Sequence, residues 1–263
     1  MVSKITVLLA LCTYTLSGSP YQLSKDDTHK IGQQIWFNEM GKRRELLVSW
    51  SEHESFPSLG IGHQIWLPKD STHRYTQGFP KLCTYLHKCG VTLPPWLRRA
   101  QYMPAPWKSR EEFLKDPTKR QELYKLLSST IDVQTNFMIE QLDRRWPTIL
   151  KSAPAQKRAA LARSFNLLRS SLLGTYSLVD YLNFKGDGIN KFEESNHQRW
   201  GLLQVLLAMP DDVLEAHVNA AFSLAAAQVL LRRIRNSVPE YTLIKFMAGW
   251  LKRVHTYAQC SAF

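Results

Sequence analysis

Apolar residues recur with the spacing of helical turns near the start of the chain, and this pattern predicts a helix with one buried face. They are Ile31, Ile35, Trp36 and Met40. The polar run of residues 26–28 precedes them and predicts a helix beginning near His29, where acidic side chains interact favourably with the helix dipole. Glu39 lies on the apolar face of this helix. We therefore expect its carboxyl group to be shielded from solvent.

Between residues 45 and 68 the helical pattern gives way to short strand-like runs. The sequence reads LLVSW, then SEHES, then FPSLGIGHQIWLP, with glycine and proline between the β-branched and aromatic positions. Such runs are typical of short strands joined by turns. A small hairpin or sheet is therefore expected here.

Helical spacing returns after Pro80 and continues over most of the remaining chain. It predicts a helix that ends at Gly90, an irregular connection over 94–106, and amphipathic helix from 110 to 150 in which Pro147 begins a new turn. Further helices are expected over 155–169, 172–183, 198–208 and 211–235. The last of these is expected to be capped by Asp211, Asp212 and Glu215.

Together these elements predict an α+β fold that is predominantly helical. We expect one domain over residues 20–263, with a small α/β lobe over about 25–80 and a helical body over about 81–263. A ligand-binding cleft is expected between the two. The chain of 263 residues is 44% hydrophobic, which is ordinary globular composition.

The first 19 residues have the pattern of a secretory signal peptide. Lys4 precedes an apolar stretch from Ile5 to Leu16, which is too short to span a bilayer, and small residues follow it. Export to the periplasm or outside the cell is the resulting expectation. In such a compartment Cys83 and Cys89 either form a disulfide or remain buried thiols. No His or Cys stands at zinc spacing, so neither a metal nor another cofactor is expected.

The charge balance favours an anionic partner. Lysine and arginine total 34 against 22 acidic residues, for a net charge of +12. Basic pairs are scattered along the chain and no nucleic-acid-binding motif accompanies them, so nucleic acid is not expected as a partner. Peptidoglycan or another anionic wall polysaccharide fits the charge and the exported setting, and we expect a monomer.

Acidic residues between positions 39 and 63 suggest glycosidic chemistry. Hydrolysis of a glycosidic bond requires one protonated carboxylic acid and one ionised carboxylate. Burial on an apolar face is expected to raise the pKa of Glu39, whereas Glu52 or Glu54 in a solvated turn would stay charged. The alternatives are an ion pair of Glu39 with Lys42 or Arg43, and two ordinary surface carboxylates at 52 and 54.

The run from Ser58 to His63, SLGIGH, together with Glu39 upstream, resembles the active-site region of phage-type lysozymes. The resemblance implies that Glu39 is the general acid and that Glu52 replaces the family's aspartate. It also places Ser58 where a threonine positions the attacking water. The interval between Glu39 and the glycines is longer than in that family, so Glu54 remains an alternative to Glu52. The chain is also similar to a group of exported bacterial proteins with FPSLGIGH-like and NFKG…WGLLQVL-like segments.

Other residues of these segments have expected roles in binding or structure. Gly60 and Gly62 are expected to be turn or bulge glycines that let the backbone pass close to another segment, and His63 to be a structural histidine bonded to a buried acid. Asn183 and Lys185 are candidates to bind an acetamido sugar or a peptide stem. Gln204 either lines the groove or is bonded internally, and Trp66 is either core or stacks on a sugar.

These observations predict an exported muramidase-like hydrolase that cleaves the glycan strands of peptidoglycan. Its two carboxyl groups would stand about 6.5–9.5 Å apart across the cleft. If no second acid faces the cleft, a lytic transglycosylase becomes the better interpretation. A wall-binding protein with a lysozyme-like groove and no turnover is the alternative of another class.

Overall fold

Of the residues that the structure describes, 62% are helical and 4% lie in strands, which form a small antiparallel sheet. The structure, a computed structural model, describes residues 21–72, 76–190, 194, 196–239, 241–259, 261 and 263. The predicted signal peptide, together with Cys12 and Cys260, lies outside the described residues. The helices are α1 (Lys25–Met40), α2 (Phe79–Lys88), α3 (Arg110–Leu114), α4 (Pro117–Ser129), α5 (Ile131–Ser152), α6 (Arg158–Arg169), α7 (Leu172–Lys185), α8 (Leu202–Ala208), α9 (Val218–Arg235) and α10 (Met247–His255).

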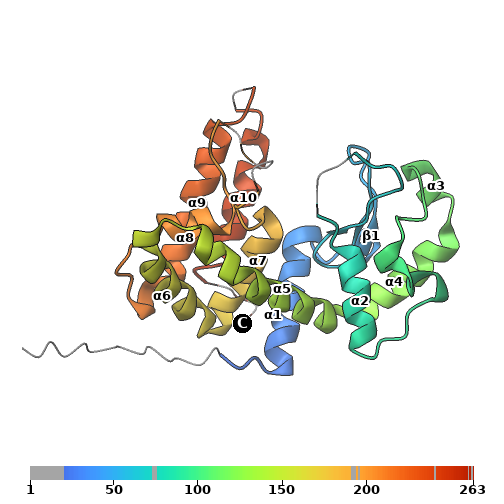
Figure 1. Ribbon diagram of the computed structural model, residues 1–263, viewed down its shortest axis with the longest axis horizontal. Helices are drawn as coiled ribbons and strands as arrows, with labels where there is room; N and C mark the ends of the chain where they lie inside the picture. The colour runs from blue at the N-terminus through green and yellow to red at the C-terminus, as the bar shows by residue number, and fades with distance from the viewer. Residues whose placement is uncertain are drawn as a thin grey trace, which may run out of the picture.

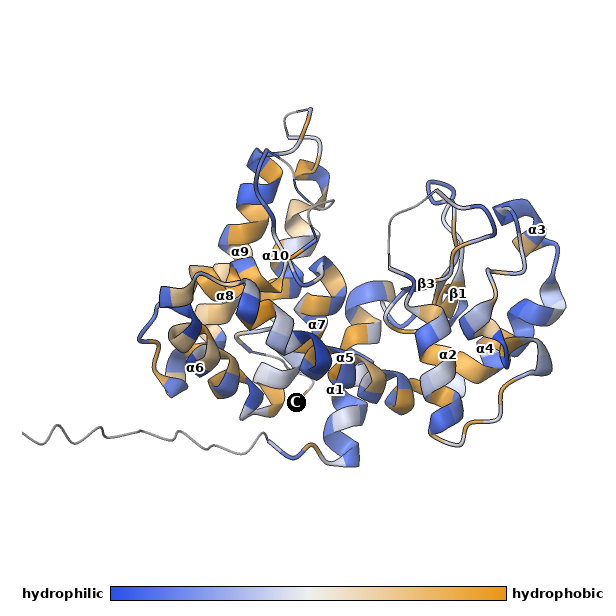
Figure 2. Cartoon of the chain, in the orientation of Figure 1, coloured by the Kyte–Doolittle hydropathy of each residue, from blue (hydrophilic) through white to orange (hydrophobic). Residues whose placement is uncertain are grey.

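The long helix α5 connects the two sides of the molecule. Figure 1 shows α1 beside α5 in the middle, with the strands and α2, α3 and α4 on one side and α6 to α10 on the other. Figure 2 shows that most helices on both sides carry hydrophobic as well as hydrophilic residues. None of the described helices is both long and apolar enough to cross a membrane.

The predicted sheet is confirmed, and it has three short antiparallel strands. They are β1 (Val48–Ser49), β2 (Ser58–Leu59) and β3 (Gln64–Ile65), in the order β1-β2-β3. Leu59 lies opposite Val48 on one side and Gln64 on the other. The register brings the turn of residues 60–63 against α5.

Helix α1 starts at Lys25, about one turn before the predicted position. Ser24 caps it: its hydroxyl accepts the backbone N–H of Asp27 at 3.1 Å, and the Asp27 carboxylate accepts the backbone N–H of Ser24 at 2.9 Å. This reciprocal capping box satisfies two N–H groups at the helix end. Ile31 and Ile35 are fully buried against the rest of the core, so the predicted apolar face of α1 is confirmed.

Two other predicted helix boundaries are wrong. Pro147 does not begin a new turn, because α5 continues through it to Ser152 and keeps Leu142 and Ile149 buried on its core face. The helix predicted from 211 starts instead at Val218. Asp211 does not cap it, since its carboxylate pairs with Lys157 at 2.7 Å.

Cys83 and Cys89 form no disulfide. Cys83 is a buried thiol within helix α2, whereas Cys89 follows the last helical residue and is exposed. Gly90 has a φ of +80°, a backbone conformation that suits the residue after a helix end. The disulfide alternative for this pair is therefore not realised.

Candidate functional site

Glu39 lies in the last turn of α1, and its side chain is only 13% exposed. The predicted shielding of this carboxyl group is confirmed. Oε1 accepts hydrogen bonds from Arg253 Nη2 at 2.7 Å and from Asn183 Nδ2 at 3.1 Å. Side chains from α1, α7 and α10 thus meet at one carboxylate.

Arg253 joins Glu39 to a second buried acid, Asp180. Its Nε donates to Asp180 Oδ2 and its Nη2 to Asp180 Oδ1, both at 2.8 Å. The hydroxyl of Tyr257 donates to Oδ2 at 2.5 Å, and Asn38 Nδ2 donates to Oδ1 at 3.2 Å. Asp180 is fully buried. One guanidinium therefore compensates two carboxylates in the interior, an arrangement that depends on these hydrogen bonds.

The pKa of Glu39 is lowered, opposite to the predicted direction. Burial raises it, but the charge and hydrogen bond of Arg253, together with His63 and Asn183, lower it by more. The carboxyl group is therefore ionised at neutral pH. The alternative pairing with Lys42 or Arg43 is not the cause, because Arg43 Nε donates to the backbone oxygen of Met40 instead.

His63 lies on the other side of the Glu39 carboxylate. Its Nδ1 is 3.6 Å from Oε2, too far for a hydrogen bond. Its Nε2 is buried and makes no hydrogen bond within the described part of the chain. Burial lowers the pKa of His63, and Arg253 lowers it further, against the opposite effects of Glu39 and Glu54. His63 is thus a neutral neighbour of a buried acid, not the bonded partner that we expected.

A cleft of about 920 Å³ opens beside this cluster, and we call it the central cleft. His63 and Asn183, two of the three groups that adjoin Glu39, line this cleft, whereas Glu39 is not itself among the lining residues. Gln64 lines it as well and donates from Nε2 to Asn183 Oδ1 at 3.4 Å. The turn after β2 and the end of α7 therefore form adjoining parts of its wall.

The glycines of the turn allow this close approach, as predicted. Gly60 has a φ of +75°, and a Cβ there would stand 2.3 Å from Gln134 Oε1. That oxygen accepts the backbone N–H of Ile61 at 3.0 Å, which fixes the turn on α5. A Cβ at Gly62 would stand 2.7 Å from Gln64 Nε2 and 2.9 Å from Asn183 Oδ1. Only glycine leaves these contacts in place.

The predicted second carboxylate does not reach the central cleft. Glu52 is 74% exposed and pairs with Arg110 at 3.5 Å, and Glu54 is exposed in the same turn. Ser58 is half-buried within the sheet, where its backbone oxygen accepts a hydrogen bond from Ser49. None of these three residues is among those that line the cleft. Their expected roles opposite Glu39 are corrected accordingly.

Acids that do line the central cleft are already paired. Asp187 Oδ2 accepts from Arg145 Nη1 at 2.9 Å, and Glu194 pairs with Arg199 at 3.3 Å. In the part of the chain that the structure describes, no group of three or more His, Cys, Asp or Glu side chains could hold a metal ion.

Two of the predicted sugar contacts lie elsewhere. Trp66 is 1% exposed and packs among Phe79, Trp96 and Trp107, so it presents no face to a ligand. Gln204 is bonded internally: Oε1 accepts the backbone N–H of Gly201 at 2.9 Å, and Nε2 donates to the backbone oxygen of Gly188 at 3.1 Å. The substrate-binding role expected for both is corrected, and the core and internal alternatives hold.

Lys185 does line the central cleft, in an unusual environment. Its Nζ stands 3.7 Å from the ring centre of Phe184 and 3.8 Å from that of Trp250. Burial, together with the positive charges of Arg233 and Arg253, lowers its pKa to about 6. Its amine is therefore mostly uncharged at neutral pH.

Arg253 and Asp180 are the site residues that the sequence analysis missed. The apolar spacing of Met247, Leu251 and Val254 would have indicated α10. Asp180 is the lone acid within the apolar run YSLVDYL, a position that requires a buried partner. Comparisons of the chain with protein-family models, with curated proteins and with solved structures found no match.

Proposed function

We propose that this protein is an exported, lysozyme-like enzyme that cleaves the glycan strands of peptidoglycan, with Glu39 as the residue that transfers the proton. The observation that carries the proposal is the position of Glu39: a buried carboxylate whose neighbours, His63 and Asn183, line the central cleft. The volume of about 920 Å³ accommodates several sugar rings. The motif around Ser58 to His63 supports the same assignment.

Cleavage with one carboxylate fits this cleft better than the two-carboxylate mechanism, because Glu39 lies directly behind His63 and Asn183 in the cleft wall, whereas Glu52 and Glu54 are exposed on their turn. Protonated Glu39 would donate its proton to the glycosidic oxygen as the bond to the anomeric carbon breaks. The resulting carboxylate would then take the proton of the substrate's own C6 hydroxyl as that oxygen attacks the anomeric carbon. The products are a new hydroxyl end and a 1,6-anhydro end, and no water is consumed.

The ion pair with Arg253 supports a second candidate function. It favours the carboxylate form of Glu39, whereas proton donation needs the acid. A groove with a permanently paired glutamate suits a wall-binding protein without turnover. In the enzyme, the same pair requires proton uptake first, so cleavage is expected to accelerate as the pH falls.

Digestion of purified peptidoglycan by the protein without its first 19 residues tests both candidates. We expect soluble fragments with anhydro ends from the wild type and none from Glu39→Gln. Reducing ends in place of anhydro ends would show that water is the nucleophile and would contradict the one-carboxylate mechanism. Tight binding without cleavage by the wild type would refute the enzyme and support the wall-binding protein.

A further inference from the structure

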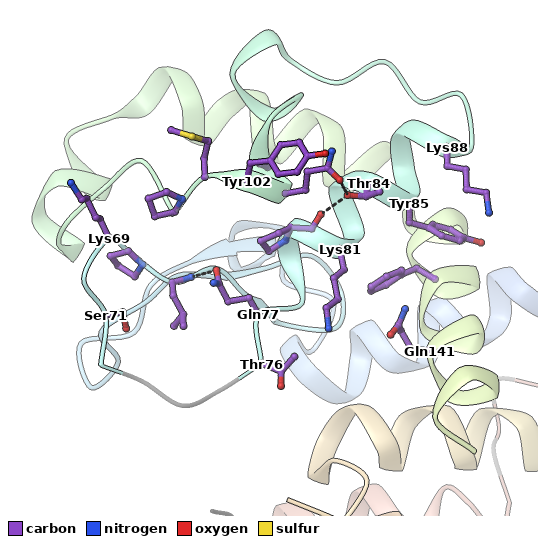
Figure 3. Close-up of a pocket in the computed structure, with 18 of the residues that line it drawn as sticks. Lys69, Ser71, Thr76, Gln77, Lys81, Thr84, Tyr85, Lys88, Tyr102 and Gln141 are labelled. Atoms are coloured by element: carbon purple, nitrogen blue, oxygen red, sulfur yellow. Dashed lines mark hydrogen bonds between the residues drawn. The ribbon is translucent and has the colours of Figure 1, made fainter. Parts of the chain in front are cut away.

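A second hollow of about 860 Å³ adjoins the central cleft. Figure 3 shows it between the segment after β3, helix α2 and the side of α5, with Lys69, Lys81, Lys88 and Tyr102 around it. We call it the basic hollow. The two hollows lie side by side, because they share part of their lining. The shared residues are Thr76, Gln77, Lys81, Phe137 and Gln141.

Positive charge predominates around the basic hollow. Lys69, Lys81, Lys88 and Arg144 line it, whereas Asp70 is the one acid among its described lining residues. Arg144 pairs with Glu140 of the same helix. Lys81 lines both hollows. Partial burial lowers its pKa, and the positive charges of Arg145 and Arg144 lower it further. An anionic ligand would relieve this repulsion.

The remaining surface of the basic hollow suits a polar polymer. Tyr102 is 75% exposed and Tyr85 is half-buried, so aromatic surface is available for packing. Gln77 is fixed by the backbone N–H of Leu67, which donates to Oε1 at 2.9 Å. Thr84 donates to Gln101 Oε1 at 3.1 Å. Amide, hydroxyl and aromatic groups of this kind are what a ligand site uses to orient its ligand.

We propose that the basic hollow binds the carboxylate-bearing peptide stems of the strand whose sugars occupy the central cleft. The proposal rests on the proposed function and adds a substrate requirement to it. Lys81 at the junction and Lys88 about two turns further along α2 are the cations that would pair with the stem carboxylates. The neutral sugars of the same strand would gain nothing from them.

Binding is measured on the Glu39→Gln protein, so that turnover does not interfere. The probes are peptidoglycan fragments with stems, the same glycan after enzymatic removal of its stems, and a neutral oligomer of N-acetylglucosamine. We expect Lys81→Glu and Lys88→Glu each to weaken binding of the stem-bearing fragments by about tenfold. Binding of the neutral oligomer should change less than twofold. The matched control is Lys151→Glu, the same charge reversal on an exposed residue of α5 that lines neither hollow.

Equal losses of affinity for all three probes in Lys81→Glu and Lys88→Glu would overturn the stem assignment. So would an equally large loss of affinity in Lys151→Glu. Losses on stem-free glycan as large as on stem-bearing fragments would place the lactyl carboxylates in the hollow instead and also overturn it. If Lys81→Glu lowers the melting temperature, Lys81→Gln replaces it. Binding of stem-free glycan without any gain from stems refutes this inference alone, whereas failure to bind any probe refutes the glycan groove as a whole.

Discussion

At the scale of single residues, the feature that matters most is the sharing of one guanidinium by two acids. Arg253 donates to both Glu39 and Asp180. Asp180 has Tyr257 and Asn38 as further donors, whereas Glu39 has Asn183 and faces His63 across 3.6 Å. Asp180 is thus the better-satisfied member of the pair. Glu39 is the one of the two whose neighbours His63 and Asn183 line the central cleft.

Glu39→Gln is expected to cost about 1–3 kcal/mol of unfolding free energy at pH 7, because a hydrogen bond between charged groups is lost. The folded-state pKa of Glu39 is lowered from its ordinary value of 4.5. Its contribution is therefore fully present above pH 4.5 and disappears as the pH falls through the folded-state pKa. Urea unfolding of both proteins at pH 7 and at acid pH measures this. If the difference in unfolding free energy between the wild type and Glu39→Gln stays constant or grows on acidification, the ion-pair assignment is contradicted.

Lys185→Met is expected to stabilise the protein. The pKa of Lys185 is lowered from 10.5 to about 6, so the folded state binds its proton less tightly than the unfolded chain does. The resulting destabilisation is largest below pH 6 and vanishes above pH 10.5. We expect a gain of about 1–3 kcal/mol at pH 6 and little gain at pH 10. Thermal unfolding at the two pH values tests this, with Lys151→Met as the exposed control. A loss of stability in Lys185→Met at both pH values would contradict the prediction.

At the scale of elements, the turn between β2 and β3 fixes the site by contact with α5. Gly60, Ile61 and Gln134 hold the turn in place, and His63 follows at a φ of 48°. A non-glycine residue in the left-handed region is uncommon and is a form of strain often found at functional sites. The position of His63 thus depends on the glycines before it.

Gly60→Ala is expected to lower the unfolding free energy by about 2–4 kcal/mol, because the new Cβ meets Gln134 and φ is positive. The control is Gly41→Ala, where φ is +58° and nothing lies within 4 Å; it should cost only about 1 kcal/mol. Urea unfolding curves of the two variants give the comparison. Equal costs would show that the contact with Gln134 contributes nothing.

Cys83 within α2 and Cys89 just after its last residue are expected to react with thiol reagents at very different rates. Cys83 is buried and its pKa is raised to about 12, whereas Cys89 is exposed. A maleimide should therefore modify Cys89 within minutes and Cys83 only when the protein unfolds. Mass spectrometry of the protein with Cys260 replaced by serine follows both sites. A mass two units low before reduction would show a Cys83–Cys89 disulfide and contradict this assignment.

At the scale of the whole molecule, the site joins the two ends of the described chain. Glu39 and Arg253 are 214 positions apart. Arg253→Met is expected to cost about 3–5 kcal/mol at pH 7, because Glu39 and Asp180 would remain buried without a cation. Part of the loss should be recovered at acid pH. Arg235→Met on the exposed end of α9 is the control in a thermal unfolding experiment, and an equal, small effect of both variants would refute the shared ion pair.

The sequence analysis predicted what local pattern determines. The helical period indicated α1 and the burial of Glu39, and glycine, proline and β-branched residues indicated the sheet and the turn around Gly60. It failed where distant residues decide the outcome. The sign of the pKa shift at Glu39 depends on Arg253, and the exposure of Glu52 depends on how its turn packs. Neither the contact with Arg253 nor the packing of this turn can be identified from the spacing of residues along the chain.

Because Arg253 belongs to α10, the counter-ion of Glu39 and Asp180 reaches them only when α10 packs against α1 and α7. Until then two acids would have to be buried side by side with no cation, which disfavours the packing of α1 on α7. The cluster behind the cleft wall is therefore completed only when α1, α7 and α10 are all in place. Under the proposed function, this requirement would keep a partly folded protein inactive until α10 has docked.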